Sequence, residues 1–205
     1  MIELFTQHTE IVNAILNAVM VLIWTAYLQV FLVSHRRQSR SIIHIDIGAA
    51  KGSRSRCLVT NLSSNPIYVQ GLVADLQKDS RISRTIVTDR NEISENDVQD
   101  PLARTNRGTL HPGETVDIGS LSDLVSRAVI SLDEEWSTDQ IDSITVTVIA
   151  ISGQADRIIG ATKTFNAENR ADCMTFSPQK LLTHQMKPRQ TRQRFSEILR
   201  DEIQA

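Results

Sequence analysis

The sequence predicts one membrane-spanning α-helix near the N-terminus, followed by a mainly-β domain built as an antiparallel β-sandwich. Three observations lead to this fold class. Residues 11–33 form an apolar stretch without a charged side chain. Residues 42–177 break into short runs rich in β-branched residues, separated by turn residues. Residues 178–205 form a basic tail in which the apolar residues follow the spacing of a short amphipathic helix.

The apolar stretch Ile11 to Val33 is long enough to cross a bilayer. As a helix it would span roughly 34 Å, and a hydrocarbon core is about 30 Å thick. A cleaved signal peptide is the alternative, but it needs a positive segment before a shorter apolar run. Residues 1–10 contain Glu3 and Glu10 and no Lys or Arg. We therefore predict an uncleaved signal anchor.

The charges beside this stretch predict its orientation. The linker 34–41 contains Arg36, Arg37 and Arg40, which we expect at the membrane surface, whereas residues 1–10 contain no cation. Cationic flanks stay in the cytoplasm. We expect a single-pass protein of the inner or plasma membrane, with a short extracytoplasmic N-terminus and a cytoplasmic domain. Reduced cysteines would fit that compartment.

Polar residues inside the apolar stretch lie on one side of the helix. Asn13, Asn17, Thr25 and Gln29 fall within an arc of about 160° when each residue advances by 100°. Amides and small residues on one side promote helix association in lipid. Asn13 and Gln29 are near enough to the ends to be tolerated without a partner, but Asn17 and Thr25 are deeper. The arc therefore predicts contact with a membrane protein or a second copy.

The remaining elements follow from apolar alternation and turn residues. The run 141–152 alternates most clearly, and 157–165 is expected to be its antiparallel partner. A hairpin is predicted across the turn 63–66. A helix is predicted over 121–130, with Ser120 or Ser122 as its cap. The other expected strands are 42–47, 56–62, 67–76, 83–87, 115–118 and 173–176, with a polar loop over 88–107.

About six to eight short strands with one helix favour an antiparallel sandwich over a βαβ fold. The turn Asn65-Pro66 and the segment Leu110-His111-Pro112-Gly113-Glu114 resemble turns of immunoglobulin-like or fibronectin-like modules. This resemblance concerns architecture over residues 42–177. It implies an immunoglobulin-like sandwich and carries no functional residue with it.

The tail has a basic part and an apolar part. Its helix is predicted over 191–203. Three roles stay open: packing on the domain, binding a partner, or touching an anionic leaflet. The tail residues expected to take part in an interaction are Arg189, Arg192, Arg194, Phe195, Ile198 and Leu199.

No pattern in the sequence predicts catalysis, a cofactor or a metal. The five histidines are dispersed without zinc-ligand spacing. Gly48 to Ser53 lacks both the spacing of a phosphate loop and a following helix. His44 and Asp46 share a strand face and could support acid-base work, but a solvated edge-strand face explains them as well. A net charge of -2 argues against nucleic-acid binding.

The sequence therefore predicts a membrane-anchored, non-enzymatic interaction or assembly module. Its expected partners are the lipid bilayer and either a membrane protein or a second copy of the chain. The alternative is a membrane-tethered enzyme or ligand-binding domain whose site is assembled from distant residues. No nucleic acid is expected to bind.

Overall fold

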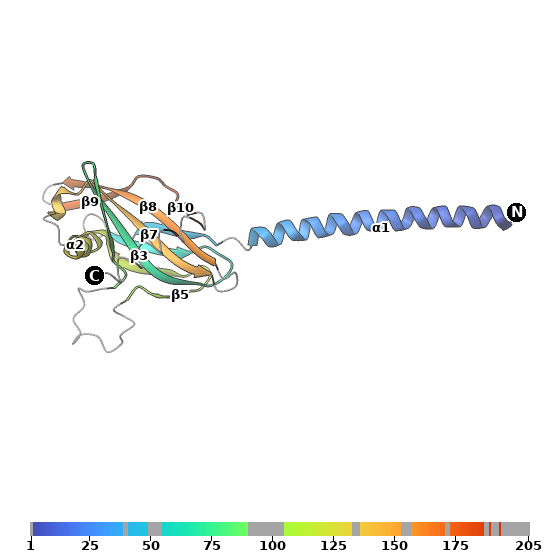
Figure 1. The fold of residues 1–205 in the computed structure, drawn as a ribbon, viewed down its shortest axis with the longest axis horizontal. Helices are drawn as coiled ribbons and strands as arrows, with labels where there is room; N and C mark the ends of the chain where they lie inside the picture. Colours follow the sequence, from blue (N-terminus) through green and yellow to red (C-terminus); the bar gives the residue numbers. More distant parts are fainter. Residues whose placement is uncertain are drawn as a thin grey trace. The chain divides into compact units, whose positions relative to one another are not determined.

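The computed structural model describes residues 2–38, 41–48, 55–89, 105–132, 136–152, 157–170 and 173–186, together with Arg189 and Gln193. The chain divides into two compact units, Met1–Arg40 and Ser41–Ala205. The first unit contains a single helix, and the second is a β domain with two sheets (Figure 1).

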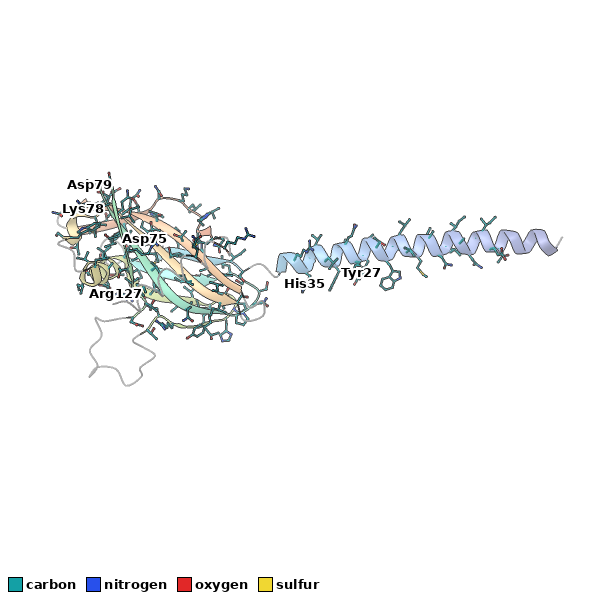
Figure 2. The ribbon with its side chains drawn as sticks, viewed as in Figure 1. Tyr27, His35, Asp75, Lys78, Asp79 and Arg127 are labelled. Atoms are coloured by element: carbon teal, nitrogen blue, oxygen red, sulfur yellow. The ribbon has the colours of Figure 1, made fainter. Side chains whose placement is uncertain are left out.

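The first unit is helix α1, Ile2–Gln38, which extends beyond the predicted span at both ends. Within it, Thr9–Arg36 is long and apolar enough to cross a membrane, a criterion that a signal sequence would also meet. Every residue of this span is exposed. Figure 2 shows side chains along the helix, with Tyr27 and His35 labelled.

The second unit is mainly antiparallel. Its small sheet has the order β1-β2-β6, and its large sheet has the order β10-β8-β7-β3-β4. Two further strands join the large sheet, β5 on β3 and β9 on β8. The strands are β1 Ile43–Gly48, β2 Arg56–Asn61, β3 Ile67–Lys78, β4 Arg81–Ile86, β5 Gly108–Leu110, β6 Thr115–Ser120, β7 Ser143–Ser152, β8 Arg157–Arg170, β9 Cys173–Pro178 and β10 His184–Gln185.

The two sheets share one hydrophobic core because alternate residues of each strand point toward it. Ile43 and Ile45 come from β1, and Phe165 comes from β8. Helix α2, Leu121–Leu132, adds Leu121 and Leu124 to the same core. A short 3-10 helix, Thr138–Gln140, precedes β7. The predicted domain of short strands with one helix is therefore confirmed in its coarse form.

The predicted pairing of β7 with β8 is confirmed, with a register from Ser143↔Asn166 to Ser152↔Arg157. The predicted cap of α2 is also found. The N–H of Asp123 donates to Ser120 Oγ at 3.0 Å, and the N–H of Ser120 donates to Asp123 Oδ2 at 3.3 Å. These reciprocal bonds satisfy two donors that a helix start leaves open. They explain why α2 follows β6 without a loop.

The predicted hairpin across 63–66 is wrong, because β2 belongs to the small sheet and β3 to the large one. The buried Asn61 accounts for the change of sheet. Its Nδ2 donates to the carbonyls of Asn65 and Leu110, each at 2.9 Å, and its Oδ1 accepts from the N–H of Ser63 at 2.9 Å. A side chain thus takes the bonds that a hairpin ladder would have made. Strand β3 instead forms a hairpin with β4, with the turn at Asp79, which has φ 52°.

A buried arginine fastens α2 to the strands beside it. Arg127 donates through Nη1 to the carbonyls of Val87 and Asp89, both at 3.4 Å, and through Nη2 to that of Ile118 at 3.2 Å. Gly119 makes room for this guanidinium: a Cβ there would lie 2.6 Å from Nη2, and its φ is +114°. Both the space and the backbone conformation therefore require glycine at this position.

Candidate functional site

The segment Gln179–Met186, which we call the strap, runs along the open edge of β8. Its residues His184 and Gln185 form β10 on β8. The N–H of Gln179 donates to Thr164 O at 2.9 Å, and that of Met186 donates to Gly160 O at 2.7 Å. The strap is therefore held to the large sheet at both of its ends.

The strap also closes the edge of β1 in the small sheet, using side chains in place of a strand. The N–H of Ile45 donates to Thr183 Oγ1 at 2.9 Å, and the N–H of Ile43 donates to Gln185 Oε1 at 3.1 Å. The same side chains also donate back, Thr183 Oγ1 to Ile45 O at 3.2 Å and Gln185 Nε2 to Ile43 O at 2.6 Å. An open strand edge invites pairing with another chain. These four bonds remove that edge over half of β1.

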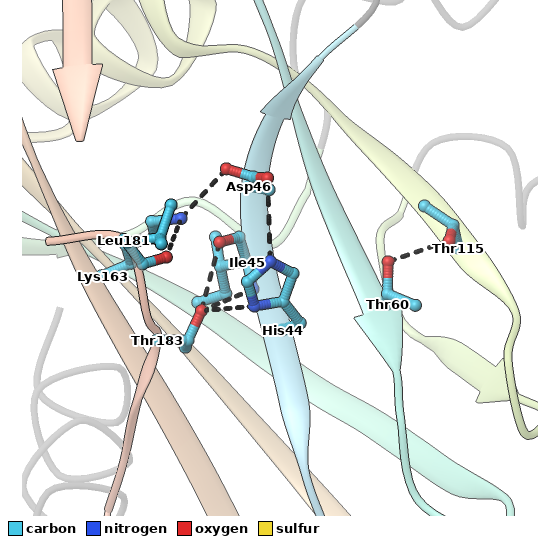
Figure 3. Close-up of polar contacts among 8 residues, drawn as sticks. All are labelled: His44, Ile45, Asp46, Thr60, Thr115, Lys163, Leu181 and Thr183. Atoms are coloured by element: carbon cyan, nitrogen blue, oxygen red, sulfur yellow. Dashed lines mark hydrogen bonds and ion pairs between the residues drawn. The ribbon is translucent and has the colours of Figure 1, made fainter.

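A buried cation lies where β1, β8 and the strap meet. The side chain of Lys163 is only 1% exposed. Its Nζ lies 3.0 Å from Asp46 Oδ1 and 3.2 Å from Leu181 O (Figure 3). The ring of Phe165 lies below it, with its centroid 5.8 Å from Nζ. A buried ammonium needs such partners, because removing it from water without them is costly.

We call the place where β1, β8 and the strap meet the seam. His44 and Asp46, noted in the sequence as a candidate acid-base pair, both lie at this seam. His44 Nε2 lies 3.7 Å from Asp46 Oδ2, and His44 Nδ1 lies 3.2 Å from Thr183 Oγ1 (Figure 3). β1 is an edge strand of its sheet, as the sequence suggested. Its polar face is not simply solvated, however, because Lys163 and Thr183 lie against it.

Asp46 acts here as a hydrogen-bond acceptor. Burial by itself would raise the pKa of Asp46. The hydrogen bonds from Lys163 and from the N–H of Ile47, with the electrostatic interactions of Lys163 and His44, outweigh burial and lower the pKa of Asp46 below its usual value. The carboxylate is therefore ionised at neutral pH and has no proton to give. Its chemistry suits an ion pair that holds three elements together.

The cysteine thiol near the seam is not a reactive nucleophile. Cys57 is a free thiol, fully buried on the core side of β2. Burial, reinforced by the charge of Asp117, raises the pKa of this thiol to about 12. It therefore stays protonated and unreactive at neutral pH. The described residues also contain no group of three or more His, Cys, Asp and Glu side chains able to hold a metal ion.

The predicted polar arc lies on the exposed surface of α1, and its members differ. Thr25 Oγ1 donates to Val21 O at 2.8 Å, so its hydroxyl is satisfied within its own helix. Trp24 and Phe31 fall within about 40° of Asn13 and Asn17 on a helical projection. Trp24 packs edge-on against Tyr27 with ring centroids 6.3 Å apart. The face of the helix around Asn17 is thus more aromatic than the predicted arc.

The predicted basic sites are described only in part. Arg36 is exposed and Arg37 belongs to α1, whereas Arg40 lies outside the described residues. In the tail, Arg189 is exposed. The remaining predicted tail residues Arg192, Arg194, Phe195, Ile198 and Leu199, and the helix expected there, lie outside the described residues.

The strap was missed from the sequence because its partners are remote. Thr183 and Gln185 lie 138 and 142 residues from the β1 residues that they bond. The only local signal is two polar side chains two residues apart, which places them on one side of an extended segment. That signal does not identify the strand they contact.

The ion pair predicts that removing one of its partners costs more stability than removing both. Asp46→Asn leaves the buried ammonium of Lys163 without its carboxylate, and we expect a loss of about 1–3 kcal/mol in the free energy of unfolding. The double variant Asp46→Asn with Lys163→Met should recover part of this loss, because no buried charge remains. The measurement is urea unfolding of the detergent-solubilised protein, followed by β-sheet circular dichroism. A double variant less stable than Asp46→Asn would contradict the ion pair.

The lowered pKa of Asp46 predicts that the free energy of unfolding depends on pH in the acid range. A carboxyl whose folded pKa lies below its unfolded pKa stabilises the fold above the unfolded value, and this contribution disappears as the pH falls through the folded pKa. The free energy of unfolding should therefore fall less steeply for Asp46→Asn than for the natural chain between about pH 5 and 3. The difference should shrink in a Lys163→Met background. Equal slopes in the natural background would refute this linkage.

Comparisons of the chain with protein-family models, with curated proteins and with solved structures find no match. A functional proposal therefore rests on the sequence and the structure of this chain alone. The described part offers a stabilising seam in the β domain and an exposed apolar helix before it.

Proposed function

We propose that the chain is a single-pass membrane protein whose β domain serves as a non-enzymatic interaction or assembly module in the cytoplasm. The observation that carries this proposal is the exposure of Thr9–Arg36, none of which is buried. The second unit already has a complete core of its own, so these apolar side chains are not needed there. A bilayer is the environment that covers such a helix at least cost.

Charge supports the proposed orientation. Glu3 and Glu10 stand on the N-terminal side of the span, and Arg36, Arg37 and Arg40 stand on the other. By the positive-inside rule the β domain then lies in the cytoplasm of a cell with this protein in its inner or plasma membrane. The free thiol of Cys57 is compatible with that compartment.

The use of polar groups supports an interaction module over an enzyme. Asp46 and Thr183 are engaged in closing the seam, and Cys57 is a buried thiol. For Asn13 and Asn17, by contrast, no side-chain hydrogen bond is found within the described part of the chain, and on a helical projection they share one side of α1 with Trp24 and Phe31. We place the contact with a membrane protein or a second copy on this face. The immunoglobulin-like type of sandwich and the C-terminal amphipathic helix stay predictions.

The orientation can be tested with single cysteines. Cys57 cannot report it, because its buried side chain would stay unlabelled on either side of the membrane. Both natural cysteines should be replaced, and one cysteine introduced as Gln7→Cys or Ser80→Cys. In intact cells whose inner membrane is accessible, an impermeant maleimide should label Gln7→Cys and not Ser80→Cys, and both should label after lysis. The opposite pattern would reverse the orientation, and release of the protein by alkaline carbonate would exclude the anchor.

The contact on α1 can be tested by a matched pair of substitutions. Asn17→Leu removes an amide without a partner in its own helix, whereas Thr25→Val removes a hydroxyl that already bonds Val21 O. Interhelical hydrogen bonds in lipid contribute about 0.6–2 kcal/mol. We expect Asn17→Leu to weaken association by about three- to thirty-fold and Thr25→Val by less. Energy transfer between labelled copies in membranes, and co-purification of a membrane partner, measure this. Equal effects of both substitutions would count against the amide face.

A further inference from the structure

Two adjacent leucines stand in water on the strap. Leu181 is 83% exposed and Leu182 is 76% exposed. Single exposed apolar residues are common on protein surfaces and carry no meaning by themselves. A neighbouring pair on a segment that is held rigidly calls for a reason.

The strap cannot turn these leucines inward, because its backbone and its polar side chains are already bonded. Leu181 O accepts from Lys163 Nζ at 3.2 Å. On either side, Gln179 N donates to Thr164 O, and Thr183 exchanges two hydrogen bonds with Ile45 (Figure 3). The bonds that close the seam therefore also hold Leu181 and Leu182 outward.

The leucines lie in a strongly cationic part of an otherwise slightly acidic chain. From Cys173 to Ser196 the sequence has no Asp or Glu, whereas the whole chain has a net charge of -2. Lys180, next to Leu181, is exposed, and so is Arg189. The cations of this segment are Lys180, Lys187, Arg189, Arg192 and Arg194.

We propose that Leu181 and Leu182 insert into the interface of an anionic bilayer, with the exposed Lys180 at the lipid phosphates. Apolar tips backed by Lys and Arg are the arrangement that such an interface binds, since the leucines leave water while the cations meet the anionic headgroups. This rests on the proposed membrane anchor. It also goes beyond that proposal, because it gives the β domain itself a lipid-contacting face.

Two observations favour lipid over a protein partner. The other exposed residues of the strap, Gln179, Lys180 and His184, are polar, so along the strap the apolar patch is confined to the two leucines, whereas a stable protein interface has a wider apolar centre. Second, Gln185 bonds Ile43, which follows the end of α1 at Gln38 by only five residues. Anchoring by α1 would therefore keep the strap near the bilayer through the covalent chain, which raises its effective concentration there.

The test uses the full-length protein in vesicles of phosphatidylcholine, with or without phosphatidylglycerol. In a background lacking Cys57 and Cys173, a nitroxide is attached at Leu182→Cys. The matched control is Ile130→Cys on α2, where the natural side chain is 80% exposed. In anionic vesicles the nitroxide at 182 should collide more with oxygen than with a water-soluble nickel reagent, whereas that at 130 should show the reverse. Circular dichroism confirms that both variants are folded.

Reversing the charge at Lys180 tests the contribution of the cation to the lipid contact. Each cation at an anionic surface strengthens binding by about five-fold, so Lys180→Glu should lower the ratio of lipid-inserted to water-exposed nitroxide at 182 by at least that factor. A nitroxide at 182 that is water-accessible on floating vesicles overturns the inference and leaves the anchor intact. A nitroxide that is immobilised and broadened as protein density rises also overturns it, and assigns the leucines to a second copy. Failure of the protein to float with vesicles overturns the anchor and this inference together.

Discussion

The fold of the β domain depends on how a buried ammonium is neutralised. Lys163 belongs to β8, Asp46 to β1, and Leu181 to the strap, so one cation joins three segments that are remote in the sequence. With the Lys163 side chain only 1% exposed, its charge requires both partners, and each partner fixes the segment that supplies it. The strap can then reach the backbone of Ile45 through Thr183. This one charge therefore adds to the backbone bonds by which the strap is held along β8.

This closure gives the polar face of β1 a structural role. An edge strand must be protected from pairing with other chains, and here protection comes from a hydroxyl and an amide that imitate a neighbouring strand. Such side chains need fixed positions, and the ion pair of Asp46 with Lys163 supplies them. The pair that in the sequence resembles an acid-base pair, His44 and Asp46, therefore lies where the two sheets are held together.

Local patterns predicted the local elements. Alternation identified β7 and its partner β8, and Ser120 was recognised as a cap because its bonds run within three residues. Two features were not predicted from the sequence, for the same physical reason. Asn61 turns the chain between sheets through Leu110, 49 residues away, and Gln185 reaches Ile43 across 142 residues. Periodicity reveals which side chains are buried, but not which distant groups they bond.

The proposed membrane anchor offers one explanation for the exposed apolar surfaces of the two units. The core between the sheets is complete, since residues such as Ile45, Leu72 and Phe165 have no exposure at all. Leu181 and Leu182 are exposed beside this core, and no residue of the span Thr9–Arg36 belongs to the described core cluster. A bilayer would satisfy both surfaces with one partner, because it offers hydrocarbon to the helix and an anionic interface to a leucine tip backed by Lys180. Two unrelated protein partners would each need a separate reason.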